Sequence, residues 1–407
     1  MNKDSTIGIK TLTGGVAAAA GFMAAGVTCG VRDTRRRDLG LLFSEFPCET
    51  AAVFTRNVVK GAPLVVTREA VETGGVRAVV ANSGNANVAT GGRGIEDARA
   101  MQDLAAEALG IEASEVAVAS TGVIGVHLPM GRISSGIKAA AGELDEGGAG
   151  FAESILTTDT RAKEAVVRAE IGGKTITVGG TAKGSGMVHP NMGTMLAFLT
   201  TDAAVENGCL QETLSRVTDR TFNRVTVDGD TSPSDMAILM ANGAAGNEPL
   251  SLDSPDYPIF AGAVESVART LAREIARGGE GATRLVEVTV DGAASEESAV
   301  AVAKSVVGSN LVKAAVFGED ANWGRVLTAM GYAGVAFDPN KVDLWFGPIK
   351  VFSRGEPVAH EEVEANATLA AGEVKITVRL GEGGASATAW GCDLSYEYVR
   401  INGSYRT

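Results

Sequence analysis

Residues 183–202 read KGSGMVHPNMGTMLAFLTTD, and this stretch joins a glycine-rich loop to an apolar strand. We predict the loop over 179–193, because glycine permits backbone conformations that other residues resist. We predict the strand over 194–201 (TMLAFLTT), since apolar and β-branched residues are typical of buried strands. Gly193 and Thr194 therefore lie where a loop meets a buried strand.

The junction carries a candidate nucleophile. Cleavage of the Gly193–Thr194 bond would make Thr194 an N-terminal residue, whose free α-amine can act as general base for its own hydroxyl. Free α-amines have a pKa of about 7.7–8.0, which suits a base near neutral pH. The same hydroxyl can make the cut, by attacking the Gly193 carbonyl in an N-to-O acyl shift that is followed by ester hydrolysis. On pattern alone, a threonine that merely begins a buried strand is the simpler interpretation.

Common nucleotide and nucleophile motifs do not fit this stretch. A phosphate loop of the G-x-x-x-x-G-K-[ST] type requires lysine after Gly184, where the sequence has Ser185. The loop also runs into a predicted strand, so the helix N-terminus that would hold phosphate is missing. The stretch has no G-x-S-x-G motif, and no G-x-G-x-x-G opens a predicted helix after a strand.

Strand-like and helix-like patterns alternate along the rest of the chain. The longest predicted helix covers 258–277, with Phe260, Val264 and Leu271 on one face. A hairpin is predicted around Gly172-Gly173. We predict further strands at 76–82, 115–120, 284–290, 373–380 and 395–402, and further helices at 96–109, 128–144, 209–222, 296–307 and 321–332. Alternation of this kind indicates an α/β (mixed α+β) enzyme fold with sheets covered by helices.

Composition narrows the possible functions. The 407 residues are 45% hydrophobic and carry a net charge of −13, so the chain can bury a core but lacks the basic surface of a nucleic-acid binder. The four scattered cysteines fit a reducing cytoplasm.

The sequence also predicts neither a membrane span nor a metal site. No run of about 18 or more strongly apolar residues occurs, so we expect no membrane span. The acidic motif at 228–239 lacks the glycine and final glutamate of a calcium loop, and we expect no metal.

The chain resembles the ornithine acetyltransferase family (ArgJ, bifunctional glutamate N-acetyltransferase/ornithine acetyltransferase). Residues 183–202 are similar to the processing site of that family. Further similar motifs occur in family order over essentially the whole chain: 14–30 (GGVAAAAGFMAAGVTCG), 81–87 (ANSGNAN), 120–125 (STGVIG), 157–160 (TTDT), 223–230 (NRVTVDGD), 279–283 (GEGAT), 317–325 (FGEDANWGR) and 401–407 (INGSYRT). Together they favour Thr194 as a nucleophile over the simpler interpretation.

The resemblance implies a self-processing fold of the ArgJ/DmpA type, with sheets layered against helices and a threonine nucleophile at the start of an internal strand. The precursor would cut itself into an α chain, residues 1–193, and a β chain, residues 194–407, which assemble as a heterotetramer. Thr194 would take the acetyl group from N2-acetyl-L-ornithine and pass it to L-glutamate with ping-pong kinetics, as a step of arginine biosynthesis. No bound cofactor is implied, and the use of acetyl-CoA as a second donor stays open.

The resemblance also assigns roles to residues elsewhere. Thr121 and Gly122 match the oxyanion hole, where a hydroxyl and a backbone N–H stabilise the negative oxygen of a tetrahedral intermediate. Lys183 and Glu280 match substrate-binding positions of opposite charge, suited to a carboxylate and to the ornithine ammonium. The other matched substrate-binding positions are Thr157, Thr194, Asn402 and Thr407.

Two features qualify these assignments. Gly193 replaces the alanine that the family commonly has before the nucleophile, and we expect cleavage to survive because both residues are small. We expect His189 to line the loop rather than to act in catalysis.

Two other classes of protein stay open: a related amidohydrolase or aminopeptidase, in which water resolves the acyl-enzyme, and an NAD-type binding module. Free acetate as the product would identify the hydrolase.

Overall fold

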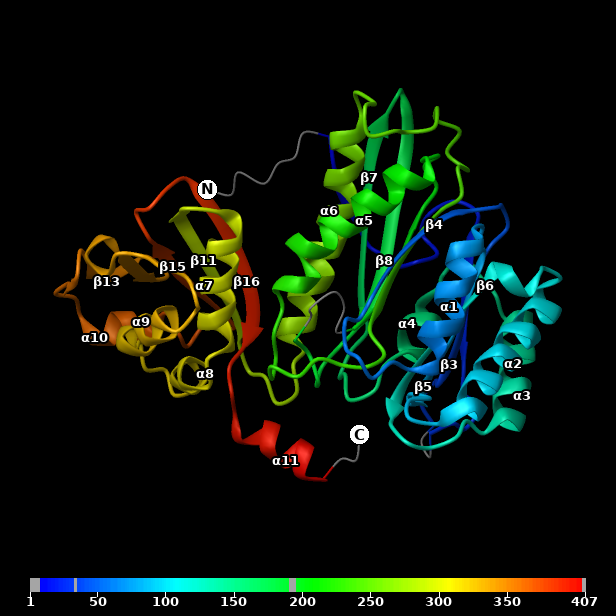
Figure 1. The fold of residues 1–407 in the computed structure, drawn as a ribbon, viewed down its shortest axis with the longest axis horizontal. Coiled ribbons are helices and arrows are strands. Elements are labelled where there is room, and N and C mark those ends of the chain that lie inside the picture. Colours follow the sequence, from blue (N-terminus) through cyan, green and yellow to red (C-terminus); the bar gives the residue numbers. More distant parts are fainter. Residues whose placement is uncertain (1–7, 33–34, 190–194, 405–407) are drawn as a thin grey trace.

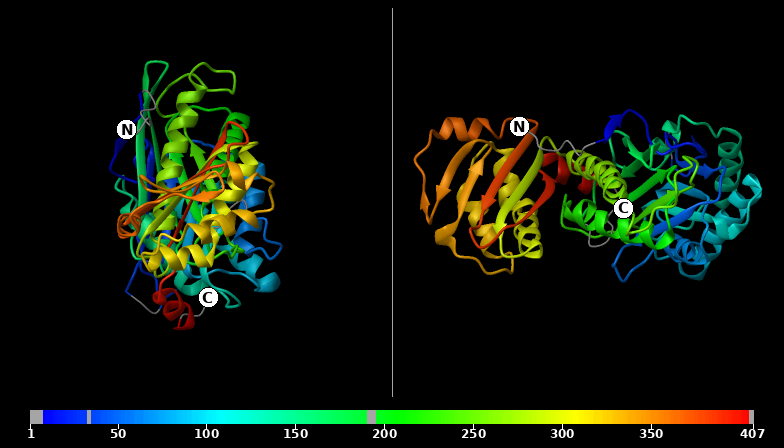
Figure 2. Two further views of the ribbon diagram at one scale, coloured as in Figure 1. Left: turned by 90° about the vertical axis from the view of Figure 1, so that its left-hand side faces the viewer. Right: turned by 90° about the horizontal axis from the view of Figure 1, so that it is seen from above.

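The computed structural model describes residues 8–32, 35–189 and 195–404, which form two lobes (Figures 1 and 2). The larger lobe stacks two sheets between helices, and the smaller lobe has a third sheet covered by helices. The predicted α/β class with helix-covered sheets is therefore confirmed.

The first sheet of the larger lobe is built from residues near the N-terminus. Its order is β2 (Phe22–Val27), β3 (Leu39–Ser44), β5 (Ala78–Asn85) and β6 (Val116–Val123), with β5 and β6 parallel. The outer face is covered by α2 (Gly91–Leu109) and α3 (Met130–Gly142), while α1 (Ala62–Thr73) packs along β6 and α4 (Ala149–Ser154) against β2 and β3. Buried apolar side chains on both faces hold these layers together.

The second sheet of the larger lobe is the central one. Its order is β1 (Lys10–Leu12), β7 (Lys163–Ile171), β8 (Lys174–Lys183), β9 (Leu196–Thr201), β10 (Met236–Ala241) and β4 (Glu49–Phe54), with β9 and β10 parallel. One face packs on α5 (Asn207–Arg220) and α6 (Tyr257–Arg277). The other face meets the first sheet and α4, where the ring of Phe151 on α4 lies edge to face with that of Phe198 on β9, with 5.3 Å between the ring centroids. The layers thus run helix, sheet, sheet, helix.

The smaller lobe follows α6. Its sheet has the order β14 (Glu356–Pro357), β13 (Ile349–Ser353), β12 (Asp343–Phe346), β15 (Glu373–Arg379), β11 (Leu285–Ala293) and β16 (Ala385–Cys392). Its helices are α7 (Glu296–Gly308), α8 (Asn310–Phe317), α9 (Trp323–Gly331) and α10 (Glu362–Ala367). After β16 the chain leaves this lobe and forms α11 (Tyr396–Ser404), the red helix in Figure 1.

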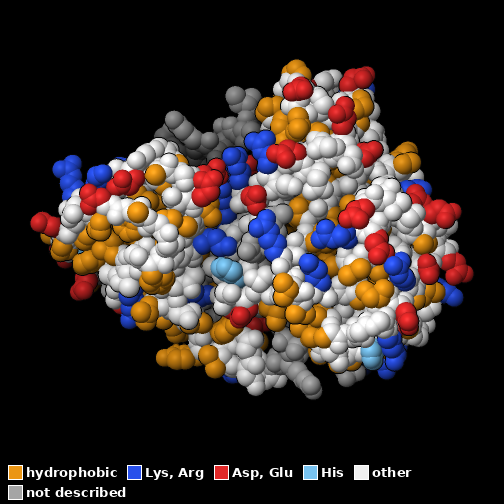
Figure 3. Space-filling view, in the orientation of Figure 1, with side chains coloured by type: hydrophobic (Ala, Val, Ile, Leu, Met, Phe, Trp, Pro, Cys, Tyr) orange, Lys and Arg blue, Asp and Glu red, His pale blue; other side chains and the backbone are white. Residues whose placement is uncertain are grey.

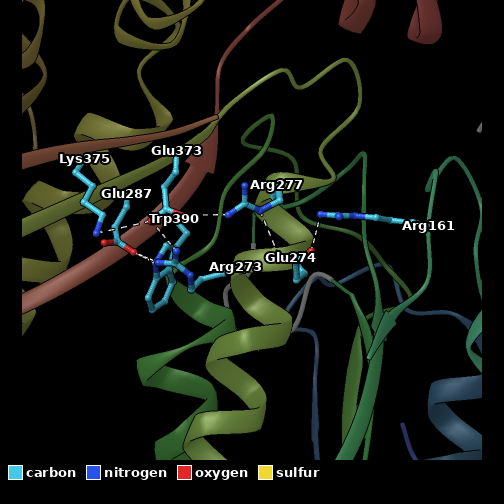
Figure 4. Close-up of polar contacts among 8 residues, drawn as sticks. All are labelled: Arg161, Arg273, Glu274, Arg277, Glu287, Glu373, Lys375 and Trp390. Atoms are coloured by element: carbon cyan, nitrogen blue, oxygen red, sulfur yellow. Dashed lines mark hydrogen bonds and ion pairs between the residues drawn. The ribbon is translucent and has the colours of Figure 1, made fainter. Parts of the chain in front are cut away.

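An ion-pair network joins the lobes (Figure 4). Arg273 on α6 pairs with Glu287 on β11 and, at 2.7 Å, with Glu373 on β15. Arg277, one turn further along α6, contacts the same Glu373 at 3.0 Å, and Trp390 donates its indole N–H to Glu287 at 2.9 Å. Figure 3 shows Lys and Arg side chains gathered along the hollow between the lobes. The network fixes the smaller lobe on α6, and with it the loop that follows α6.

Several predicted elements are confirmed and two are wrong. The hairpin turns at Gly172 and Gly173, both with positive φ, as a two-residue hairpin loop of type I′ requires. The apolar stripe of 258–277 is buried on α6. The predicted loop begins too early, because β8 continues through Gly179 to Lys183. Glycine is needed inside that strand, since a Cβ at Gly179 would lie 2.3 Å from a backbone carbonyl oxygen.

The second wrong prediction is the strand at 395–402, which is the helix α11. Ser395 begins it by accepting the backbone N–H of Glu397 at 3.2 Å, and Glu397 pairs with Arg400 at 3.0 Å one turn on. Its aromatic and β-branched residues suggested a strand, but the contacts that α11 makes with the larger lobe override that propensity.

The described residues form neither a single membrane-spanning helix nor a cluster of metal ligands. No single helix in the described ranges is long and apolar enough to cross a membrane. Within those ranges, α7 and α8 taken together reach that length and composition, with a 54° bend between them, and both contribute to the core of the smaller lobe. Among the same residues, no group of three or more His, Cys, Asp or Glu side chains is placed to hold a metal ion.

Candidate active site

A cavity of ≈ 230 Å³ brings predicted site residues together from distant parts of the chain. It lies at the ends of β6 and β8, beside the loop after α6 and helix α11. Its lining contains Thr121, Gly122, Thr157, Lys183, Glu280 and Asn402. The other three predicted residues, Gly193, Thr194 and Thr407, lie outside the described residues.

Gly122 and Thr121 occupy the end of β6. Gly122 has φ of +132°, and a Cβ there would lie 2.3 Å from the carbonyl carbon of Gly84 on the neighbouring strand β5. Only glycine fits this approach. The buried Thr121 accepts a hydrogen bond from the ammonium of Lys183, at 3.1 Å between Nζ and Oγ1. Because Lys183 occupies an acceptor position of the hydroxyl, Thr121 keeps its own proton for donation to an anionic oxygen in the cavity.

Lys183 is buried at the end of β8 among several charges. Burial lowers the pKa of Lys183, while the carboxylates of Asp159 and Asp235 oppose that shift by favouring the ammonium form. Burial would also raise the pKa of Asp159, but Lys163 and Lys183 lower it to about 2. Lys163 forms a fully buried ion pair with Asp159. This end of the cavity therefore carries closely balanced positive and negative charge.

Asp159 also fixes the backbone on both sides of the cavity. Its carboxylate accepts the backbone N–H of Gly184 at 3.0 Å and that of Thr157 at 3.2 Å. Thr157 is held from its other side as well, since its carbonyl accepts a hydrogen bond from Arg32 at 2.9 Å. One buried carboxylate thus ties the segment that carries Thr157 to the segment that follows Lys183.

The opposite wall carries a carboxylate. Glu280, only 6% exposed, accepts a hydrogen bond from the side-chain amide of Asn402 at 2.7 Å. Its backbone N–H bonds to the carbonyl of Ser185 at 2.9 Å. A Cβ at Gly186 would lie 2.3 Å from the Glu280 carboxylate, so glycine at that position makes room for the acidic side chain. The glycine-rich loop therefore shapes the wall that Glu280 occupies.

Helix α11 supplies the amide of this wall. Tyr398 and Asn402 lie one turn apart and both line the cavity, with the Tyr398 hydroxyl 3.3 Å from Asp228. Ser395 donates to the carbonyl of Gly281 at 2.5 Å. At Gly281 itself, a Cβ would lie 2.4 Å from the backbone nitrogen of Tyr398. The helix is thus docked closely on the loop that carries Glu280.

Sequence reasoning missed several residues of the lining. Asp228 lies in the motif at 223–230 and in the acidic stretch that does not fit a calcium loop, and the sequence predicts no role for it at the site. It accepts the backbone N–H groups of Met187 and Val188 at 2.6 and 2.8 Å and so holds the glycine-rich loop. Ser234 also lines the cavity, and Asp235 lines a smaller space beside it. A carboxylate immediately before an apolar run, 236–241 (MAILMA), was the available signal for Asp235.

His189 is half-buried at the rim of the loop. Its ring nitrogen Nδ1 lies 3.0 Å from the Thr226 hydroxyl. In the described part of the chain, the lining of the cavity does not include His189. Burial and the nearby Lys304 lower the pKa of His189 to about 4, while Asp228 acts in the opposite direction. The imidazole is therefore neutral at physiological pH.

This pKa predicts acid sensitivity. The folded-state pKa of about 4 lies below the ordinary value of 6.5, so between these values the unfolded chain binds a proton that the folded chain does not. His189 therefore lowers the free energy of unfolding as pH falls through this window. Replacing it in His189→Asn should remove that part of the pH dependence. Urea unfolding across the window measures it, and parallel profiles for native protein and variant would contradict the assignment.

Comparison with known proteins gives consistent matches. The sequence model of the ArgJ family matches residues 23–407. The arginine biosynthesis bifunctional protein ArgJ of Symbiobacterium thermophilum is 57% identical over 402 residues, which are 98% of this chain and 100% of that protein. The protein of the same name from Bacillus subtilis is 48% identical over 400 residues, 98% of each chain.

Solved structures also match. The crystal structure of arginine biosynthesis bifunctional protein ArgJ from Bacillus halodurans is 50% identical with a TM-score of 0.51, and covers 51% of this chain and 98% of that chain. An ornithine acetyltransferase of Mycobacterium tuberculosis, solved in complex with ornithine, is 42% identical with a TM-score of 0.43, and covers 45% of this chain and 98% of that chain.

Proposed function

The chain belongs to the ArgJ family, and from this premise we propose that it transfers an acetyl group from N2-acetyl-L-ornithine to L-glutamate in arginine biosynthesis. The observation that carries the proposal is the cavity, which has candidate oxyanion donors at Thr121 and Gly122 and a buried carboxylate–amide pair at Glu280 and Asn402. Such walls suit a small molecule that bears an ammonium group and an amide.

In the proposed reaction, the free α-amine of Thr194 takes the proton of its own hydroxyl as the oxygen attacks the acetyl carbonyl. Thr121 and Gly122 donate hydrogen bonds to the negative oxygen that forms. The proton then passes to the departing α-nitrogen, which leaves ornithine free and an acetyl ester on Thr194. L-Glutamate enters, its amine attacks the ester, and N-acetylglutamate leaves with the threonine restored.

Charge on the cavity walls supports a place for each substrate group. Glu280 and Asn402 would hold the terminal ammonium of acetylornithine. The Asn402 amide nitrogen donates to the Glu280 carboxylate, so the carboxylate and the amide oxygen are the acceptors that a cation can use. Lys183 would face the α-carboxylate. Thr157 lies in the same lining and would contact the bound substrate.

The proposal includes self-cleavage between Gly193 and Thr194 and assembly of the α and β chains, residues 1–193 and 194–407, as a heterotetramer in the cytoplasm. The four free cysteines support a reducing compartment. We propose that the enzyme works without a bound cofactor. We also propose that acetyl-CoA is an additional acetyl donor to glutamate.

Product analysis tests the function. Purified protein with N2-acetyl-L-ornithine, labelled in the acetyl group, and L-glutamate should yield labelled N-acetylglutamate, which mass spectrometry detects. Labelled free acetate as the main product would instead identify the related amidohydrolase. A parallel reaction with labelled acetyl-CoA and no acetylornithine tests the second donor.

Substituting Glu280 by glutamine should weaken substrate binding. The change keeps the shape but removes the charge, so we expect the KM for acetylornithine to rise about 10- to 100-fold, as for loss of one charge-assisted hydrogen bond. The matched control is Glu274→Gln, on the same helix–loop segment, where the carboxylate pairs with Arg161 and Arg277 on the surface. Equal KM values for native protein and Glu280→Gln would contradict the assignment.

A further inference from the structure

A small chamber adjoins the cavity on the side of the oxyanion donors. We call it the Asp235 chamber; its lining includes Thr121, Lys183, Met195, Ser234 and Asp235. Its volume of ≈ 20 Å³ is enough for one water molecule, which needs about 10–15 Å³ on this measure. The chamber shares Thr121 and Lys183 with the cavity, so a group inside it lies next to the proposed oxyanion donor Thr121.

Two buried polar atoms of this chamber have no hydrogen-bond partner among the described residues: Oδ2 of Asp235 and Oγ of Ser234. Asp235 is only 3% exposed. Buried polar atoms without partners are costly and rare, so a group of this kind beside a reaction site calls for an explanation. Both residues precede β10, which runs parallel to β9 with Met236 opposite Leu196. The pair thus lies level with the start of β9.

The charges that face Lys183 come from four elements. Asp159 follows α4, Lys163 is on β7, Asp235 precedes β10 and Glu280 follows α6. Asp159 is already bonded to Lys163 and to two backbone N–H groups, and Glu280 is bonded to Asn402. Of these carboxylates, Asp235 is the one with a fully buried oxygen that lacks a hydrogen-bond partner among the described residues.

We propose that Asp235 is a positioning residue that keeps Lys183 in its ammonium form against Thr121, through one water molecule in the Asp235 chamber. The ammonium occupies an acceptor position of the Thr121 hydroxyl and so directs its proton toward the oxyanion. This inference rests on the proposed function, because Asp235 affects the reaction only if Thr121 stabilises a tetrahedral intermediate.

The proposal has a direct consequence for pH dependence. Burial lowers the pKa of Lys183 and raises the pKa of Asp235 well above its ordinary value, and the charge of each group opposes the shift of the other. Replacing the Asp235 carboxylate by an amide of the same shape removes the negative charge that favours the ammonium form. Lys183 then loses its proton at lower pH. Activity that depends on the ammonium must then begin its alkaline decline at lower pH as well.

The test compares Asp235→Asn and Asp235→Glu with the native enzyme. The matched control is Asp97→Asn, which alters another buried carboxylate with an oxygen that lacks a hydrogen-bond partner, on α2. We expect Asp235→Asn to move the alkaline limb of kcat down by about one pH unit, which lowers kcat by at most about 10-fold at any one pH. Because Lys183 also faces the substrate α-carboxylate, we expect the KM for acetylornithine to rise over the same pH range. Asp235→Glu should keep the native limb, and Asp97→Asn should change none of these.

A lower kcat for Asp235→Asn with an unmoved alkaline limb would overturn the proposal, since a merely structural role gives that result. If Asp235→Asn does not fold, Asp235→Ser serves instead, with the same expected shift.

A second measurement tests the effect of Asp235 on Lys183 separately from the proposed function. NMR of protein with ¹³C-labelled lysines, assigned by the signal lost in Lys183→Met, follows the titration of Lys183 without any substrate. A titration that is unchanged in the Asp235 variants overturns the inference, whether or not acetyl transfer is observed.

Discussion

Thr194→Ala should be recovered as one uncut chain of 407 residues without acetyltransferase activity. Alanine has no hydroxyl, so it can neither attack the Gly193 carbonyl nor accept an acetyl group. The native protein should separate into pieces of residues 1–193 and 194–407 when its intact mass is measured under denaturing conditions. Acetyl transfer should fall by about 10⁴-fold or more, as removal of a catalytic nucleophile does in other enzymes.

Two companion variants sharpen this result. Thr194→Ser keeps a hydroxyl and should still be cut, whereas Gly193→Ala restores the residue that the family commonly has and should be cut at least as fast as the native protein. A cut Thr194→Ala chain would show that another group makes the break. Native protein that stays whole would contradict self-processing and reopen the amidohydrolase and binding-module alternatives.

The second large effect is expected at Thr121. Thr121→Val keeps the shape of the side chain and removes the hydroxyl, so the proposed oxyanion loses one donor and Lys183 loses its partner. We expect kcat to fall about 10²- to 10³-fold, the usual cost of removing one oxyanion-hole donor. The measurement is the initial rate of N-acetylglutamate formation at saturating acetylornithine.

Thr121→Ser is the control, because it keeps a hydroxyl on the same backbone and should retain most of the activity. Self-cleavage of Thr121→Val should be followed separately by intact mass, since an uncut variant would be inactive for a different reason. A fully processed Thr121→Val protein with native kcat would remove Thr121 from the proposed mechanism.

Helices and hairpins with a clear local pattern could be predicted from the sequence. The stripe of α6 repeats every three to four residues over a long segment, and the Gly172-Gly173 turn has positive φ at both positions. Strands β2 (FMAAGV) and β3 (LGLLFS) were missed because they are buried on both faces and rich in alanine, glycine and leucine, so they show no alternation of polar and apolar residues. Segment 396–404 forms the helix α11 because of its contacts with the loop that carries Glu280, and not because of the propensity of its residues.

The candidate site was predictable only through motifs. Lys183, Glu280 and Asn402 were found by resemblance, and nothing in their spacing of about a hundred residues predicts that they meet. The hydrogen bond from Lys183 to Thr121 depends on where β8 and β6 end, which no local pattern encodes. Asp235 was missed because an unsatisfied buried carboxylate is recognisable only when its surroundings are known.

The order of strands in the central sheet has a consequence for biosynthesis. Strands from before the proposed cut, β8 on one side and β4 on the other, enclose β9 and β10, which come from after it. An uncut precursor can assemble this sheet within one molecule, at a rate independent of concentration. Once cut, an unfolded protein would have to find its other piece by diffusion, so refolding becomes second order. Loss of structure on heating should therefore be reversible in Thr194→Ala at dilutions where the processed enzyme does not recover.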